Sequence, residues 1–197
     1  MRIPTPMNPN VANLLRTYNR ATVDEIQQGL TWYSQASGEA RRRIPDRDRD
    51  TILGVVAALS PQTAWARNIR YAERLIYDGA CPSPQNRKVV ALDILAGARP
   101  EERLGGNKVR AFYHCLRDQN SEAVCVDGHA YSCWSGVRIV TSKCPTISDR
   151  LYCVIANDFR EAAQIVGIRP NQMQAVNWLA WRRMHGVRNE VDREWGK

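Results

Sequence analysis

The sequence predicts an all-α fold for this chain of 197 residues. Apolar residues recur at spacings of three and four along most of its length, as one buried face of a helix requires. Capping side chains precede these segments, and glycine or proline follows them. Only two short segments, residues 124–126 and 137–140, resemble extended chain. We therefore expect helices packed on helices, without a substantial sheet.

The first predicted helix covers residues 22–37 and begins with a capping box, in which Thr22 and Glu25 each satisfy the other residue's backbone N–H. The second, residues 49–60, is apolar almost all round. Such a helix belongs at the centre of a fold, because none of its faces suits water. The third, residues 63–79, is amphipathic and stops at a glycine.

Five more helices are expected after residue 79. Residues 87–97 form a shorter helix that ends at a glycine, and residues 104–118 begin with glycines and continue as an amphipathic helix. A helix over residues 128–134 follows the apolar run Val-Cys-Val. Two longer helices complete the chain over residues 148–167 and 169–186, the last of them starting after a proline.

Length and composition predict one globular domain over residues 1–197, acting as a monomer in the cytoplasm. No apolar run approaches the roughly 20 residues of a membrane span, and the first ten residues lack the apolar core of a secretory signal. The six cysteines contain no Cys-x-x-Cys pair, so we expect free and mostly buried thiols. His129 and Cys133 share a helix face, but two ligands do not make a metal site, and neither a metal nor a cofactor is expected.

The chain is basic, with 28 Lys and Arg against 20 Asp and Glu. A net charge of +8 suits a polyanion such as nucleic acid. The alternative is that the basic residues only form a solvated protein surface. The three aspartates that follow the arginines of residues 41–43 favour this alternative for that segment.

Two polar stretches have both a structural and a functional interpretation. In Leu-Gly-Gly-Asn-Lys, residues 104–108, paired glycines before a helix allow a close approach of backbone to phosphate, and Lys108 adds a charge. The alternative is a tight turn with a lysine in solvent. In Leu-Ser-Pro-Gln-Thr, residues 59–63, Gln62 has an amide that can hydrogen-bond a base edge, or it belongs to a plain loop.

Asp127, in the segment Val-Asp-Gly-His, stands between an apolar run and a predicted helix start. An aspartate there caps the helix by accepting a hydrogen bond from one of its first N–H groups. That structural role is compatible with catalysis, because a cap fixes the carboxylate while leaving it able to face a cleft. Its residue type and place make Asp127 the first candidate for a reacting carboxylate.

Taken in order, LSPQTAW, LGGNKVRAFY and VDGHAYSCW resemble the helix-hairpin-helix DNA glycosylase superfamily of the endonuclease III type. The resemblance covers residues 50–136, and Lys108 precedes Asp127 by 19 residues, close to the family spacing. It implies a helical glycosylase-type domain that binds double-stranded DNA. LGGNK is shorter than the family hairpin and lacks its Gly-Val-Gly, and no cysteine follows Cys153, so the iron–sulfur cluster of many members is not expected.

The resemblance also implies roles for individual residues. Asp127 matches the essential carboxylate and Lys108 matches the lysine nucleophile of lyase-type members. Gln62 matches the glutamine that inserts into DNA, and Gly105 and Gly106 match the hairpin that binds backbone phosphate. Beside these matches, the polar and basic residues Asn107, Arg67, Arg110 and His129 are further expected DNA contacts.

The segments GNKVRAFYHCL and VDGHAY are most similar to a phage-associated branch, the amino acid:DNA transferases or alpha-glutamyl/putrescinyl thymine pyrophosphorylase-like proteins. This branch implies thymine hypermodification, which protects viral DNA from restriction. The implied reaction joins a free amino acid such as glycine to 5-pyrophosphoryloxymethyl-uracil in DNA and releases pyrophosphate. The alternatives are a DNA N-glycosylase of base excision repair and a catalytically inactive DNA-binding module, in which Asp127 only caps a helix.

Overall fold

The computed structural model describes residues 8–140 and 143–187. These residues form ten α-helices and no strand, which confirms the all-α prediction for the described part of the chain. The two segments with extended character, residues 124–126 and 137–140, lie in loops. In the same ranges, no helix is both long and apolar enough to cross a membrane.

The described helices form two compact units. The first holds residues up to Trp32 together with Asn120–Val187, and the second holds Tyr33–Gln119. The assignment of residues 1–197 to one domain stays a prediction, and each unit is described by itself.

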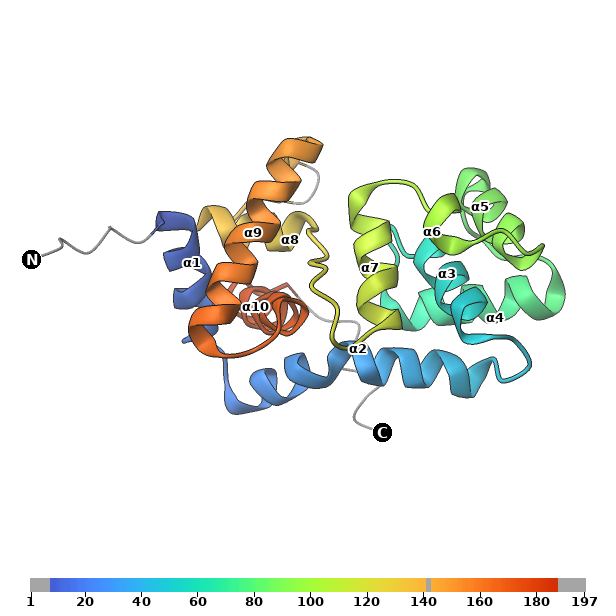
Figure 1. Cartoon of the computed structure of the whole chain (residues 1–197), viewed down its shortest axis with the longest axis horizontal. Coiled ribbons are helices and arrows are strands. Elements are labelled where there is room, and N and C mark those ends of the chain that lie inside the picture. Colours follow the sequence, from blue (N-terminus) through green and yellow to red (C-terminus); the bar gives the residue numbers. More distant parts are fainter. Residues whose placement is uncertain (1–7, 141–142, 188–197) are drawn as a thin grey trace, which may run out of the picture. The chain divides into compact units, whose positions relative to one another are not determined.

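The first unit is built on four helices that pack against one another, α1, α8, α9 and α10 (Figure 1). The N-terminal part of α2 completes it, because Gly29 lets that helix approach α10 closely. A Cβ at Gly29 would lie 2.7 Å from the backbone of Val176. These helices span Pro9–Tyr18 (α1), Val23–Arg43 (α2), Gly128–Ser135 (α8), Asp149–Val166 (α9) and Pro170–Met184 (α10).

Helix α1 is not predicted by the sequence analysis, although its start signals are present. Asn8 caps it by accepting a hydrogen bond from the N–H of Asn10, and Pro9 occupies the first helical position. Val11 and Leu14 face the core of the unit, at a spacing of three. The proline-rich composition before residue 10 hid this pattern.

The second unit surrounds one apolar helix. All residues from Ile52 to Leu59 of α3 are buried, which confirms the predicted central helix, and α3 contacts α4, α5, α6 and α7 (Figure 1). Gly54 lies against Pro100 of α6 at a distance that would not admit a Cβ. The helices span Arg49–Leu59 (α3), Trp65–Asp78 (α4), Gln85–Leu95 (α5), Pro100–Arg103 (α6) and Asn107–Arg117 (α7).

Most predicted helix ends are confirmed. Thr22 and Glu25 form the reciprocal capping box, with N···O distances of 2.9 and 3.2 Å. Gly79 and Gly167 end their helices in the left-handed conformation. One end is wrong: α2 continues past the predicted Ser37 to Arg43, because the following turns still bury apolar residues against the second unit's core.

Candidate functional site

The segment that leads to Asp127 is fixed by a tyrosine. Val124, Cys125 and Val126 are buried, and the hydroxyl of Tyr152 on α9 bridges their backbone. It donates to the carbonyl of Val124 at 2.6 Å and accepts from the N–H of Val126 at 3.2 Å. These bonds satisfy backbone groups that no sheet pairs, and they hold the chain up to the start of α8.

The carboxylate of Asp127 is held from two sides. Oδ1 accepts a hydrogen bond from the N–H of Ala130 at 2.8 Å, so the predicted helix cap is confirmed. Oδ2 accepts from Nε1 of Trp178, on α10, at 3.0 Å. The side chain is half-buried, and a carboxylate has about four lone-pair positions, so two hydrogen bonds leave it able to accept a proton.

Trp178 connects Asp127 to two further groups of the first unit. The guanidinium carbon of Arg182 lies 4.1 Å from the centre of the indole ring, in cation–π contact. The ring of His129, an expected DNA contact, stands edge-on to the indole with ring centres 6.3 Å apart. We call Asp127, His129, Trp178 and Arg182 the carboxylate cluster; all four are partly exposed.

Sequence analysis missed Trp178 and Arg182. Both lie on a helix that it predicts, and their spacing of four puts them on one face of that helix. A tryptophan and an arginine stacked there were detectable as a pair. Their meeting with Asp127 was not, because 51 residues separate Trp178 from the aspartate.

The cysteines near Asp127 are poor nucleophiles. All six cysteines are free and four are buried, which confirms the prediction of mostly buried thiols. Burial raises the pKa of the Cys133 thiol to about 12, and the negative charge of Asp127 adds to the effect. Burial and the same carboxylate also raise the pKa of Cys144. Both thiols therefore stay protonated at neutral pH.

The second unit contains the glycine segment, which forms a short helical hairpin. Helix α6 is followed by Leu104, Gly105 and Gly106, and then by α7. Gly106 has φ 73° and ψ 142°, a conformation that favours glycine, whereas Gly105 has no such requirement. A Cβ on either glycine would meet nothing within 4 Å, so protein packing does not explain why residue 105 is glycine.

The other hairpin residues line its helical arm. Asn107 and Lys108 are the first two residues of α7 and are partly exposed. Arg110 is exposed, and its Nε donates to the carbonyl of Leu104 at 2.8 Å, so it closes the hairpin turn. The start of α7 has no side-chain cap, and the first N–H groups of a helix lack partners within it.

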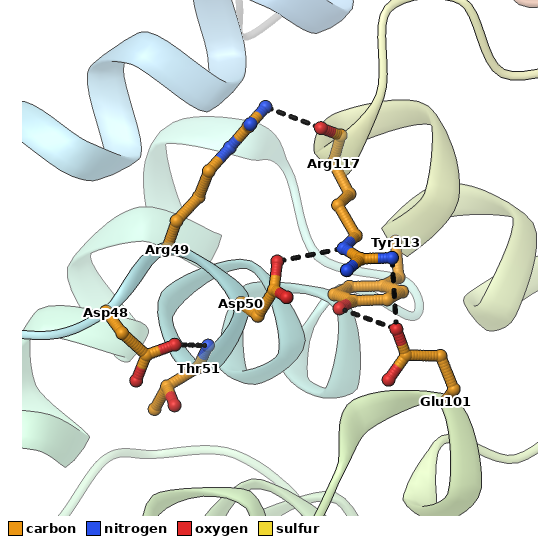
Figure 2. A network of polar contacts seen from close by, with 7 residues as sticks. All are labelled: Asp48, Arg49, Asp50, Thr51, Glu101, Tyr113 and Arg117. Atoms are coloured by element: carbon orange, nitrogen blue, oxygen red, sulfur yellow. Dashed lines mark hydrogen bonds and ion pairs between the residues drawn. The ribbon is translucent and has the colours of Figure 1, made fainter.

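A polar network fixes α6 and α7 to the start of α3 (Figure 2). Arg117 at the end of α7 binds Asp50 of α3 at 2.9 Å and Glu101 of α6 at 3.3 Å. The buried hydroxyl of Tyr113 donates to the same Glu101 carboxylate at 3.3 Å, and burial raises its pKa above the ordinary range. The two contacts with Glu101 hold the arms of the hairpin together, and Arg49 of α3 also donates to the backbone carbonyl of Arg117.

Gln62 lies in the loop between α3 and α4. It is exposed and has φ 53°, and it is the single non-glycine residue with positive φ in the described ranges. The loop around it is fixed, because Thr63 donates its N–H to the carbonyl of Ser60 and Arg87 donates to that of Pro61. A glutamine held in the left-handed region costs about 1 kcal/mol or more, and such strain is common at functional sites.

The structure distributes the predicted site residues over both units. Asp127 and His129 belong to the first unit and lie together there. The second unit holds the remaining ones. These are Gln62, exposed Arg67 on the first turn of α4, Gly105, Gly106, Asn107, Lys108 and Arg110. Among the described residues, no group of three or more His, Cys, Asp and Glu side chains is placed to hold a metal ion.

Comparison with known families matches residues 3–185 to the model of a family of unknown function, DUF7178. The chain belongs to the DUF7178 family. The matched region of this DUF7178 protein includes the carboxylate cluster and the hairpin, so both are parts of the family domain. Neither the curated proteins nor the solved structures contain a match to the chain.

Proposed function

We propose that this DUF7178 protein modifies a base in double-stranded DNA, with a domain of the helix-hairpin-helix glycosylase type and Asp127 as the reacting carboxylate. The main support is the carboxylate itself, which is held by hydrogen bonds from α8 and α10 and remains partly exposed. A reacting group needs this combination of fixed geometry and access. The order of the three motifs that resemble the superfamily supports DNA as the substrate.

The proposed reaction transfers an amino acid to 5-pyrophosphoryloxymethyl-uracil. The amine nitrogen attacks the methylene carbon, a C–N bond forms, and the C–O bond to pyrophosphate breaks. The pyrophosphate leaves with the electron pair of that bond, and the nitrogen loses one proton, which Asp127 accepts. The carboxylate also stabilises positive charge that develops on the methylene carbon as the leaving group departs.

DNA binding is proposed for the hairpin and the loop of Gln62. The empty space around Gly105 and the uncapped start of α7 suit a backbone phosphate, which needs close approach to N–H groups. Exposed Gln62 suits insertion at the site of a base that has left the stack. Lys108, with Arg67 and Arg110, supplies positive charge for phosphate, and the net charge of +8 favours such a partner.

Nucleoside mass spectrometry tests the reaction. The full-length protein is incubated with DNA that carries 5-pyrophosphoryloxymethyl-uracil and with a mixture of amino acids, and the DNA is digested to nucleosides. We expect a nucleoside heavier than thymidine, in which the nitrogen of the amino acid replaces one hydrogen of the 5-methyl group, with release of pyrophosphate. Abasic sites would favour the N-glycosylase alternative, which uses a carboxylate in the same way near C1′ of the sugar. If the protein binds DNA but forms neither product, the result would favour the alternative of a catalytically inactive DNA-binding module.

Replacing Lys108 tests DNA contact separately from chemistry. Lys108→Ala should reduce the slope of log Kobs against log salt by about one, because one phosphate contact is lost. Fluorescence anisotropy at several salt concentrations measures it. Lys88→Ala, on α5, is the matched control and should keep the slope of the unchanged protein. Equal slopes in both variants would exclude a phosphate contact of Lys108.

A further inference from the structure

Helix α9 takes the place of a neighbouring strand along the extended segment of residues 122–126. At one end of the segment, Nε of Arg160 donates to the carbonyl of Glu122 at 3.1 Å, and the hydroxyl of Tyr152 bonds the backbone at the other end. The two contact points are about 12 Å apart along α9 and about 10 Å apart along an extended chain. The segment therefore runs antiparallel to α9, and side chains of a helix supply its hydrogen bonds.

Tyr152 makes the contact that lies nearest to the carboxylate. In extended chain, the carbonyl of one residue and the N–H of the second residue after it point to the same edge. A parallel neighbouring strand would fill both groups with a single residue. Here one hydroxyl fills them, because it donates to Val124 at 2.6 Å and accepts from Val126 at 3.2 Å. These bonds fix the chain one residue before Asp127.

We propose that Tyr152 is a positioning residue, which acts through Asp127 and not on the substrate. The carboxylate meets two donors on different helices, the N–H of Ala130 on α8 and the indole N–H of Trp178 on α10. Such a cap needs non-helical backbone, and Asp127 has φ −102° and ψ −176°. Tyr152 holds the chain that leads into this conformation. The inference rests on the proposed function for its effect on catalysis, but the orientation of the carboxylate is independent of any reaction.

Tyr152→Phe removes this contact with little change in packing. It keeps the ring, which packs against the core of the first unit, and removes only the hydroxyl. The carbonyl of Val124 and the N–H of Val126 then lose their partner at buried residues, so the chain has to shift to find another. A displacement of about 1 Å at a reacting group lowers a rate by up to about 100-fold. In the nucleoside assay, Tyr152→Phe should therefore lower kcat by about 10- to 100-fold and leave the KM for DNA unchanged.

The indole N–H groups give a readout that needs no DNA. In a proton–nitrogen correlation spectrum of the full-length protein, each of the six tryptophans gives one indole resonance. Tyr152→Phe should shift the resonance of Trp178, because the bond from its Nε1 to Asp127 changes. The resonance of Trp134 should stay in place, since its partner is Asp158 and neither residue belongs to the extended segment. Trp178→Phe and Trp134→Phe assign the two resonances.

Two variants are matched controls. Tyr18→Phe removes a tyrosine hydroxyl beside the same core, where it has no hydrogen-bond partner among the described residues. Arg160→Gln acts on the same segment, but at Glu122, its far end. Both controls should keep kcat and the Trp178 resonance. If Tyr152 contributes to stability alone, Tyr152→Phe will lower the thermal midpoint but leave kcat and the resonance unchanged, and this result would overturn the positioning role.

The positioning role and the proposed reaction fail separately. A fall in kcat with an unchanged Trp178 resonance would refute the positioning role, because the loss would then not pass through Asp127. A shifted resonance with an unchanged kcat would refute it as well and retain the reaction. If the unchanged protein forms no modified nucleoside, the transfer reaction is refuted, and the spectrum alone decides whether Tyr152 orients the carboxylate.

Discussion

Replacing Asp127 should separate its structural and chemical roles. Asp127→Ala removes the helix cap and the bond from Trp178, each worth about 1 kcal/mol, so we expect a loss of roughly 2 kcal/mol in the free energy of unfolding. Asp127→Asn retains one carbonyl oxygen, which cannot serve both donors. The amide nitrogen then faces either the N–H of Ala130 or that of Trp178, and the expected loss is about 1 kcal/mol.

A second N-terminal cap provides the matched control. Asp48 caps α3 through a hydrogen bond from the N–H of Thr51 at 2.9 Å, and it is exposed. Asp48→Asn loses the same negative charge at a helix start but keeps a carbonyl oxygen for the N–H of Thr51, so its cost should be a few tenths of a kcal/mol. Urea unfolding at pH 7 measures both variants. Since the charge effect is common, the difference between them reports the bond from Trp178.

The chemical role is measured on the same proteins. Product formation in the nucleoside assay should fall at least about 100-fold in Asp127→Asn, the lower range for loss of a general base. Trp178→Phe should remove the extra destabilisation of Asp127→Asn in a double-mutant cycle. Full activity in Asp127→Asn would refute the catalytic assignment. A stability loss no greater than that of Asp48→Asn would refute the second hydrogen bond.

Three further predictions concern the second unit. Gly105→Ala should keep the thermal midpoint but weaken DNA binding in anisotropy, because its Cβ has room in the protein and would meet a phosphate. By contrast, Gly106→Ala should lower the free energy of unfolding by about 1–3 kcal/mol, since its φ of 73° favours glycine. Unchanged DNA affinity in Gly105→Ala would exclude backbone contact there. Gln62→Gly should leave stability equal or raise it by up to about 1 kcal/mol while it weakens DNA binding, and a clear loss of stability would refute strain at φ 53°. Hydrogen bonds from Thr51 lower the pKa of Asp48 below its ordinary value of about 3.9. The ionised carboxylate therefore stabilises the fold above that pH, and this stabilisation is lost as the pH falls through the lowered pKa. The stability difference between the unchanged protein and Asp48→Asn should therefore shrink from pH 5 towards pH 2 in thermal melts, and a difference independent of pH would contradict this.

Local signals in the sequence predicted most of the fold. The capping box at Thr22, the buried helix α3 and the glycine ends of α4 and α9 each depend on residues within a few positions of one another. Such signals are legible because the bonds form within one helical turn. The errors have the same origin: α2 was ended too early because its last turns are charged, and only burial in the second unit shows why they remain helical.

The candidate site was predictable to the same extent. The cap at Asp127 is a local bond to Ala130 and was predicted, whereas the bond to Trp178 joins residues 51 positions apart and was not. The conformation of Gln62 was also hidden, because no rule of composition gives a glutamine a positive φ. Sequence analysis selected the carboxylate of Asp127 but did not identify Trp178, which holds that carboxylate in place.

Comparison of two aspartates in the first unit shows why exposure decides the assignment. Asp158 on α9 resembles Asp127 in its partners, since its carboxylate accepts from the indole N–H of Trp134 at 2.6 Å and from the amide of Asn8 at 3.0 Å. Its two bonds join α9 to the start of α1 and to the end of α8. Asp158 is only 6% exposed, so no substrate reaches it. Asp127 has a comparable pair of donors but remains partly exposed. In both places a hydrogen bond from a tryptophan N–H fixes a carboxylate. Exposure to solvent makes Asp127, and not Asp158, the candidate for a reacting group.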